Sequence, residues 1–85
     1  MTPDSKIITS PLSGKVTSHG ITVDVIIVRL ETANEWSLEV VAPEGTSTVW
    51  DELFRSDQDA LAEFTRTLED EGIVAMLRND KVVLH

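Results

Sequence analysis

Cysteine is absent from this chain of 85 residues, and aromatic residues, glycine and positive charge are all scarce. Without cysteine there can be no disulfide, thiolate zinc site, iron–sulfur cluster or thiol nucleophile. Only seven lysines and arginines stand against 15 acids, which gives a formal net charge of −8. Binding of nucleic acid is therefore disfavoured, because that affinity comes largely from basic side chains at phosphates.

Motifs of nucleophilic, zinc and nucleotide sites are missing as well. The two histidines, His19 and His85, do not stand at a catalytic or metal-binding spacing. Four glycines in all leave no glycine-rich loop for a phosphate group. We therefore expect a protein that is not an enzyme and that needs no cofactor and no metal.

Size and composition indicate a single folded unit. A chain of 85 residues supports one hydrophobic core, and an apolar fraction of 41% is enough to drive its burial. We predict one domain over residues 1–85, with residues 1–5 disordered. No apolar run resembles a signal peptide or approaches the roughly 20 residues of a membrane helix. The expected location is the cytoplasm, without a membrane partner.

A two-residue His19-Gly20 turn predicts the first strand pair. Glycine accepts a positive φ, and histidine tolerates one at the preceding position. In this register, Val16 lies opposite Val23 on one face, and Lys15 lies opposite Asp24 on the other. A shift of one residue would destroy both matches, so the register is specified.

The second predicted strand, residues 21–30, changes its pattern midway. Its first half is apolar at odd positions and its second half is apolar at even positions. Two explanations are open: a β-bulge near Val25 and Ile26 redirects the side chains, or the middle of the strand is covered on both faces. Because the sequence offers one obvious helix, cover on the second face would come from another copy. The predicted interface is then Ile26, Val28 and Leu30.

A clean alternation from Trp36 to Ala42 predicts a third strand with one dry and one wet face. Pro43-Glu44-Gly45 is typical of a three-residue hairpin loop, which sets Leu38 opposite Trp50, and a short fourth strand follows over residues 46–50. Trp36 and Trp50 share the dry face. We expect them to pack under the helix rather than to stack nucleic-acid bases, because interleaved basic residues are missing.

The helix signal covers residues 57–71. Ser56 can cap the first free amides, and an apolar stripe at helical spacing follows. Gly72 is placed to end the helix, and the apolar runs 73–77 and 82–84 predict a terminal hairpin or an extra strand. The fold class is α+β: an antiparallel meander of four strands, one amphipathic helix packed on one sheet face, then one or two C-terminal strands.

Glu69, Asp70 and Glu71 form an acidic cluster at the predicted negative end of the helix dipole, where acids are unfavourable. A solvated, charged helix end explains the cluster most simply. The functional alternatives are a hard-cation site, although the sequence lacks an EF-hand spacing, and a docking patch for a basic protein. Residues 51–71 carry eight acids and two arginines, which also fits plain solubility.

Two functional hypotheses lead. The first is a small non-enzymatic interaction module that forms a homodimer through Ile26, Val28 and Leu30 or through an exposed sheet face. The alternative is an acidic regulatory or inhibitory protein that binds a basic protein with residues 51–71. A ligand site between helix and sheet, and binding of single-stranded nucleic acid, rank behind both.

Three stretches carry a resemblance to other proteins. Residues 46–54, residues 56–61 and Glu71-Gly72-Ile73 resemble short uncharacterised bacterial proteins of no known activity. The resemblance implies a free-standing bacterial domain and transfers no catalytic residue. The order of four strands and then a helix is also similar to the PC4-like single-strand-binding arrangement. Those proteins rely on basic, aromatic-bearing sheets, and the charge of −8 departs from that pattern.

Overall fold

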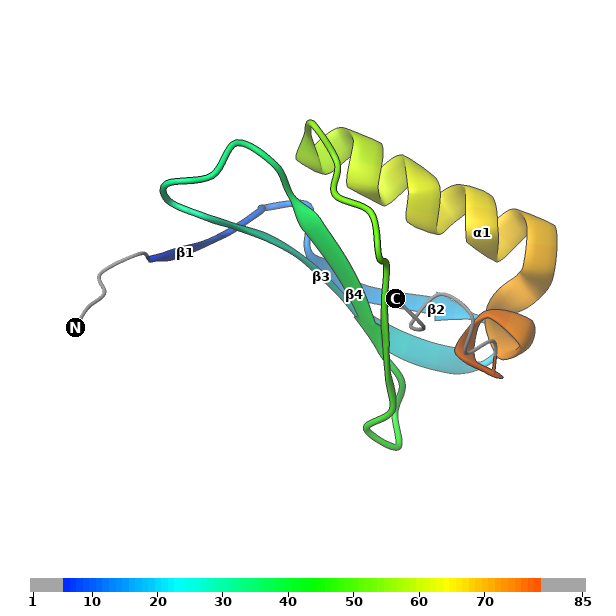
Figure 1. Cartoon of the computed structure of the whole chain (residues 1–85). Helices are drawn as coiled ribbons and strands as arrows, with labels where there is room; N and C mark the ends of the chain where they lie inside the picture. Colours follow the sequence, from blue (N-terminus) through cyan, green and yellow to red (C-terminus); the bar gives the residue numbers. More distant parts are fainter. Residues whose placement is uncertain (1–5, 79–85) are drawn as a thin grey trace.

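The computed structural model describes residues 6–78, which form a sheet of five strands with one helix laid across one sheet face (Figure 1). The elements are β1 (Ile7–Thr9), β2 (Gly14–Ser18), β3 (Ile21–Leu30), β4 (Ser37–Val41), β5 (Ser47–Val49) and α1 (Asp57–Arg78). The central strand β3 pairs antiparallel with β1 and β2 along one edge and with β4 along the other. The predicted α+β class is confirmed.

Both predicted hairpins have the predicted register. His19 and Gly20 form the β2–β3 turn with φ values of 52° and 79°. Lys15 Nζ lies 2.8 Å from Asp24 Oδ1 across the strand pair. In the β4–β5 hairpin, Gly45 takes a φ of 102°. Local turn chemistry is thus sufficient to align β2 with β3 and β4 with β5.

The pattern change in β3 does not come from a bulge near Val25 and Ile26. The pairing of β3 with β4 runs without interruption from Asp24 to Val28. The irregularity lies instead along the other edge of β3, between β1 and β2. There the four residues from Ser10 to Ser13 stand opposite only two residues of β3, Ile26 and Ile27. The even-numbered side chains of β3 therefore all point away from the helix, although several of them are apolar.

Residues 10–13 form a detour of the edge strand that is tied to β3 and to the helix. The backbone N–H of Ser10 donates to the Ile27 carbonyl at 2.8 Å. The Ser10 side chain is 2% exposed, and its Oγ donates to Asp57 Oδ2 at 2.7 Å. Next to Asp57, Ser56 Oγ accepts the N–H of Asp59 at 3.0 Å, which is the predicted helix cap.

The end of the helix differs from the prediction. Gly72 does interrupt the helical backbone, with φ 82° and ψ 159°, but helix resumes after it and continues to Arg78. A strand over residues 73–77 is therefore wrong. Ile73 and Met76, three residues apart, share one face of the resumed helix and are each 1% exposed. The predicted strand over 82–84 and the predicted disorder of 1–5 lie outside the described residues.

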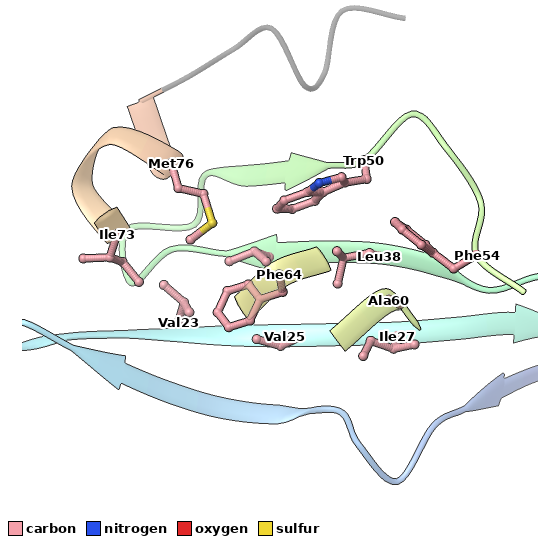
Figure 2. Packing of buried hydrophobic residues seen from close by; sticks show 11 residues of the cluster. Val23, Val25, Ile27, Leu38, Trp50, Phe54, Ala60, Phe64, Ile73 and Met76 are labelled. Carbon is pink, nitrogen blue, oxygen red and sulfur yellow. The ribbon is translucent and has the colours of Figure 1, made fainter. Parts of the chain in front are cut away.

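The core lies between the helix and the near face of the sheet (Figure 2). Phe64, 2% exposed, occupies its centre over Val25 of β3. The buried cluster draws on β3, β4, the segment after β5 and both parts of the helix: Val23, Val25, Ile27, Leu38, Val40, Trp50, Phe54, Ala60, Phe64, Ile73 and Met76. Over residues 6–78, no helix combines the length and the apolar character needed to cross a membrane.

Candidate functional site

The sheet face opposite α1, called the outer face below, carries the predicted interface residues. Successive side chains of β3 alternate between the two faces, so Val23, Val25 and Ile27 enter the core. Ile26 and Val28 point the other way and are only half-buried. Leu30 is 47% exposed on this outer face. No described element covers these side chains within the chain.

Neighbouring strands add further aliphatic side chains to the outer face. Ile7 of β1 lies directly opposite Leu30 and is 65% exposed. On the far side, Val41 of β4 and Val49 of β5 have the same orientation, and Val49 is 40% exposed. The apolar even positions of β3 are thus the middle of a wider aliphatic surface.

This surface deepens into an apolar hollow of about 250 Å³ at the β1 end of the sheet. Val28 and Leu30 of β3 contribute to its lining, together with Ile7, Ala33 and Leu53. Ile7, Leu30 and Leu53 come from three separate parts of the chain and are 65%, 47% and 54% exposed. Three of the large aliphatic side chains that are solvent-exposed in the single chain therefore lie together at the hollow.

Two contacts fix the shape of the hollow. Arg29 Nη1 donates to the Ala33 carbonyl at 2.9 Å and to the Leu30 carbonyl at 3.2 Å, and its guanidinium lies 5.2 Å from the centre of the Trp36 ring. These bonds hold the β3–β4 loop that brings Ala33 to the rim. Reciprocal backbone bonds of 2.8 and 2.9 Å between Trp36 and Phe54 hold the chain beside β4. Leu53, next to Phe54, is thereby placed at the hollow.

Charge is distributed unevenly between the two sides of the molecule. Residues 51–78, which include α1, carry eight acids and three arginines, whereas residues 6–50 carry five acids and three basic residues. On the outer face, Lys15 and Asp24 neutralise each other at 2.8 Å. Glu39, half-buried, lies between the cross-strand partners Ile26 and Val49. Most of the excess negative charge is therefore in the segment that contains the helix.

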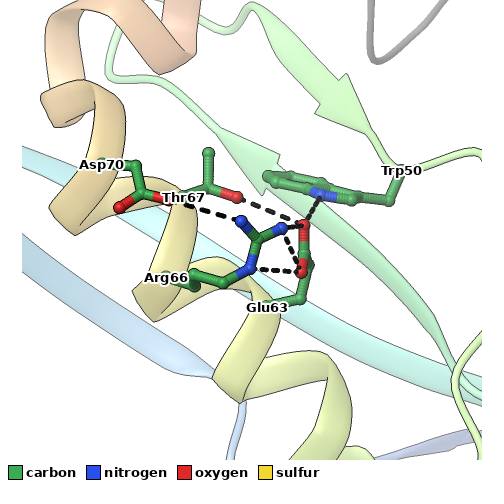
Figure 3. A network of polar contacts seen from close by, with 5 residues as sticks. All are labelled: Trp50, Glu63, Arg66, Thr67 and Asp70. Atoms are coloured by element: carbon green, nitrogen blue, oxygen red, sulfur yellow. Dashed lines mark hydrogen bonds and ion pairs between the residues drawn. The ribbon is translucent and has the colours of Figure 1, made fainter.

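The helix carries a polar network on its side facing Trp50 (Figure 3). Arg66 Nη2 donates to both carboxylate oxygens of Glu63 at 2.7 Å, and Arg66 Nη1 donates to Asp70 at 3.3 Å. Glu63 also accepts weaker bonds of 3.4 Å from the Trp50 indole and the Thr67 hydroxyl. Hydrogen bonding to Glu63 and its negative charge raise the pKa of Arg66. Because these acids already bind Arg66, the network is satisfied within the chain.

A second cleft of about 400 Å³ lies between the segment before α1 and the helix itself. Its charged lining is mixed and includes Glu52, Arg55, Asp59 and Arg66. Arg66 is already bound to Glu63. The cleft is larger than the apolar hollow, but its charges favour no one class of ligand. We therefore place the candidate site at the outer face.

The structure separates the two predicted sites. Glu69, Asp70 and Glu71 are exposed on the helix, and Asp70 pairs with Arg66. Among residues 6–78, no group of three or more potential metal ligands comes together. A charged helix surface of this kind is typical of a soluble domain, so the exposure of these acids does not by itself indicate a binding site. Trp50, 5% exposed, and the half-buried Trp36 pack with the core as predicted.

The sequence predicted an interface at Ile26, Val28 and Leu30, which lie on the outer face, but it did not indicate Ile7 or Leu53. One signal for Leu53 was present, because it alternates with Phe54, an aromatic residue that matches the dry face of the preceding strands. Comparison of the chain with protein-family models, with curated proteins and with solved structures finds no match.

Proposed function

We propose that the chain is a non-enzymatic interaction module that forms a homodimer through its outer face. The observation that carries this proposal is the apolar hollow, where Ile7, Leu30 and Leu53 converge while about half or more of each side chain stays exposed. Contiguous apolar surface on a small domain is typical of an interaction site. Its burial is favourable by about 25 cal/mol per Å² of apolar area.

The distribution of charge supports a second copy of the chain as the molecule that covers the outer face. Like-charged surfaces brought together would oppose association of a chain with a net charge of −8. The outer face carries less of this charge, because Lys15 compensates Asp24 and the acidic helix α1 lies on the other side of the sheet (Figure 1). Two copies can therefore approach through this face with their most acidic segments turned away from each other.

The available area fits a weak, reversible dimer. The five strands hold 26 residues, and at about 3.3 Å along each strand and about 4.8 Å between strands these give a face of about 400 Å². Two such faces would remove on the order of 800 Å² from water, which is below the standard size of a stable interface and typical of a weak association. A two-fold contact between identical faces is self-complementary and closes after two copies.

Lysine substitutions at the hollow test the proposed dimer interface. Leu30→Lys and Leu53→Lys change exposed side chains, so both variants are expected to fold, while a desolvated ammonium should prevent contact with a second copy. Val74→Lys is the matched control, because Val74 is 49% exposed on the helical segment after Gly72. The measurement is solution mass by multi-angle light scattering over a dilution series, with circular dichroism to check folding.

We expect a dimer for the unaltered chain and for Val74→Lys, and a monomer for Leu30→Lys and Leu53→Lys at the same concentration. A monomer for the unaltered chain at every concentration and pH examined would overturn the proposal. A dimer that persists in both hollow variants would place the interface elsewhere and would overturn it as well.

A further inference from the structure

Glu39 is an acid in the middle of an otherwise aliphatic stretch of the outer face. Its register partners are Ile26 of β3 on one side and Val49 of β5 on the other. The side chain is half-buried between them, and no hydrogen bond or ion pair joins it to another described residue. Any copy that covers both Ile26 and Val49 must also cover the Glu39 carboxylate.

The other charged groups near this face offer Glu39 no compensation. Asp24, on β3, and Asp51, just after β5, are acids, as is Glu35 at the rim of the hollow. Of the basic residues near this surface, Lys15 of β2 lies beyond β3 and binds Asp24 at 2.8 Å, and Arg29 at the hollow donates to the Leu30 and Ala33 carbonyls. A covered Glu39 would therefore lose water without gaining a partner from its own chain.

We propose that Glu39 limits self-association through the outer face, and that uptake of a proton by its carboxyl group releases this limit. The inference rests on the proposed homodimer and adds a regulatory residue to it. Covering an ionised carboxylate without a partner is costly, whereas a neutral carboxylic acid or amide of the same shape is covered at much smaller cost. Each dimer contains two copies of Glu39, so the cost is incurred twice.

The pH dependence has a definite sign. If the dimer favours protonated Glu39, then dimerisation takes up protons, and association must tighten as the pH falls. The effect is small near pH 7 and grows as the pH falls. Association by way of a Glu39 ion pair with the second copy would give the opposite sign, because protonation would then remove an attraction.

Glu39→Gln tests the inference directly, since glutamine keeps the shape of the side chain and removes the charge. The matched control is Glu44→Gln, which removes an equal charge from the tip of the β4–β5 hairpin, outside the outer face. Sedimentation equilibrium at pH 7 and pH 5 gives the dimer dissociation constant of the unaltered chain and of each variant. Urea midpoints show whether each variant keeps its fold.

We expect Glu39→Gln to tighten the dimer by about tenfold or more at pH 7 and to lose most of the tightening that the unaltered chain shows between pH 7 and pH 5. Glu44→Gln should behave like the unaltered chain at both values. This control matters because acidification also lowers the overall charge, and the sequence pI is about 4.5.

The outcomes separate this inference from the proposed function. An unaltered chain that dimerises, with Glu39→Gln dimerising equally or more weakly, would overturn the role of Glu39 and leave the homodimer in place. Equal tightening by Glu39→Gln and Glu44→Gln would also overturn it, because net charge alone would then be responsible. Monomers throughout, including Glu39→Gln at pH 5, would remove both proposals.

Discussion

Replacement of Gly72 by alanine should destabilise the fold through the backbone alone. Gly72 has φ 82° and ψ 159°, a combination that residues with a Cβ atom almost never adopt. The bend at this point turns residues 73–78 toward the sheet (Figure 1), so that Ile73 and Met76 close one end of the core. A side chain at position 72 therefore opposes the conformation on which these two buried residues depend.

The magnitude follows from the geometry. A Cβ atom built at Gly72 has no atom within 4 Å apart from those of its chain neighbours and of the adjacent helix backbone, so contact with the rest of the fold adds nothing to the cost. The backbone strain is about 1–3 kcal/mol. Alanine recovers about 0.4–1 kcal/mol by reducing the freedom of the unfolded chain. We expect a net loss of about 1–2 kcal/mol, which lowers the Tm of a domain of this size by roughly 4–16 °C.

Urea denaturation followed by the fluorescence of the two tryptophans, of which Trp50 is buried in the core, measures this loss. Gly14→Ala is the control, because a Cβ at Gly14 is equally free of contacts and the φ of Gly14 is not positive. The control should change the free energy of unfolding by less than about 1 kcal/mol. The reasoning fails if Gly72→Ala is as stable as Gly14→Ala.

Three further substitutions test the packing and the polar contacts. Phe64→Ala empties the centre of the core and should cost about 3–5 kcal/mol, enough to leave much of the chain unfolded at 37 °C in a circular dichroism melt. Ser10→Ala removes a buried hydroxyl that binds the start of α1 and should cost about 1–3 kcal/mol in the same urea assay. The exposed Lys15–Asp24 pair should give a coupling energy below about 1 kcal/mol in a double-mutant cycle, and 1 M salt should reduce it further.

Sequence alone predicted the hairpins well because their determinants are local. His19 and Gly20 select a tight turn, and Gly45 completes a three-residue loop, so neither register needed information from distant residues. The helix cap at Ser56 is local in the same sense. By contrast, β1 has only three residues and is defined by its pairing with the far end of β3, which no short-range pattern reveals.

The error at residues 73–77 has a different origin. A short apolar run has no periodicity of its own, so strand and helix fit it equally well until its contacts are known. The contacts of Ile73 and Met76 with the core decide for helix. The hollow could not be predicted from the sequence for a related reason. Ile7 and Leu53 lie near Leu30 only because the tertiary fold brings β1 and the segment before α1 to this end of β3. Residues 26, 28 and 30 could be grouped from the sequence because one strand carries all three.

The detour at residues 10–13 bears on how this sheet avoids uncontrolled polymerisation. An open edge of unpaired amides and carbonyls recruits further strands, and each added strand presents a new edge, so such growth has no natural end. Here one edge is broken into pieces of three and five residues, and the strand at the other edge, β5, has only three. The longest strand, β3, lies in the interior of the sheet. Growth through edges is thus interrupted on both sides, whereas contact through the outer face ends when a single partner has covered it.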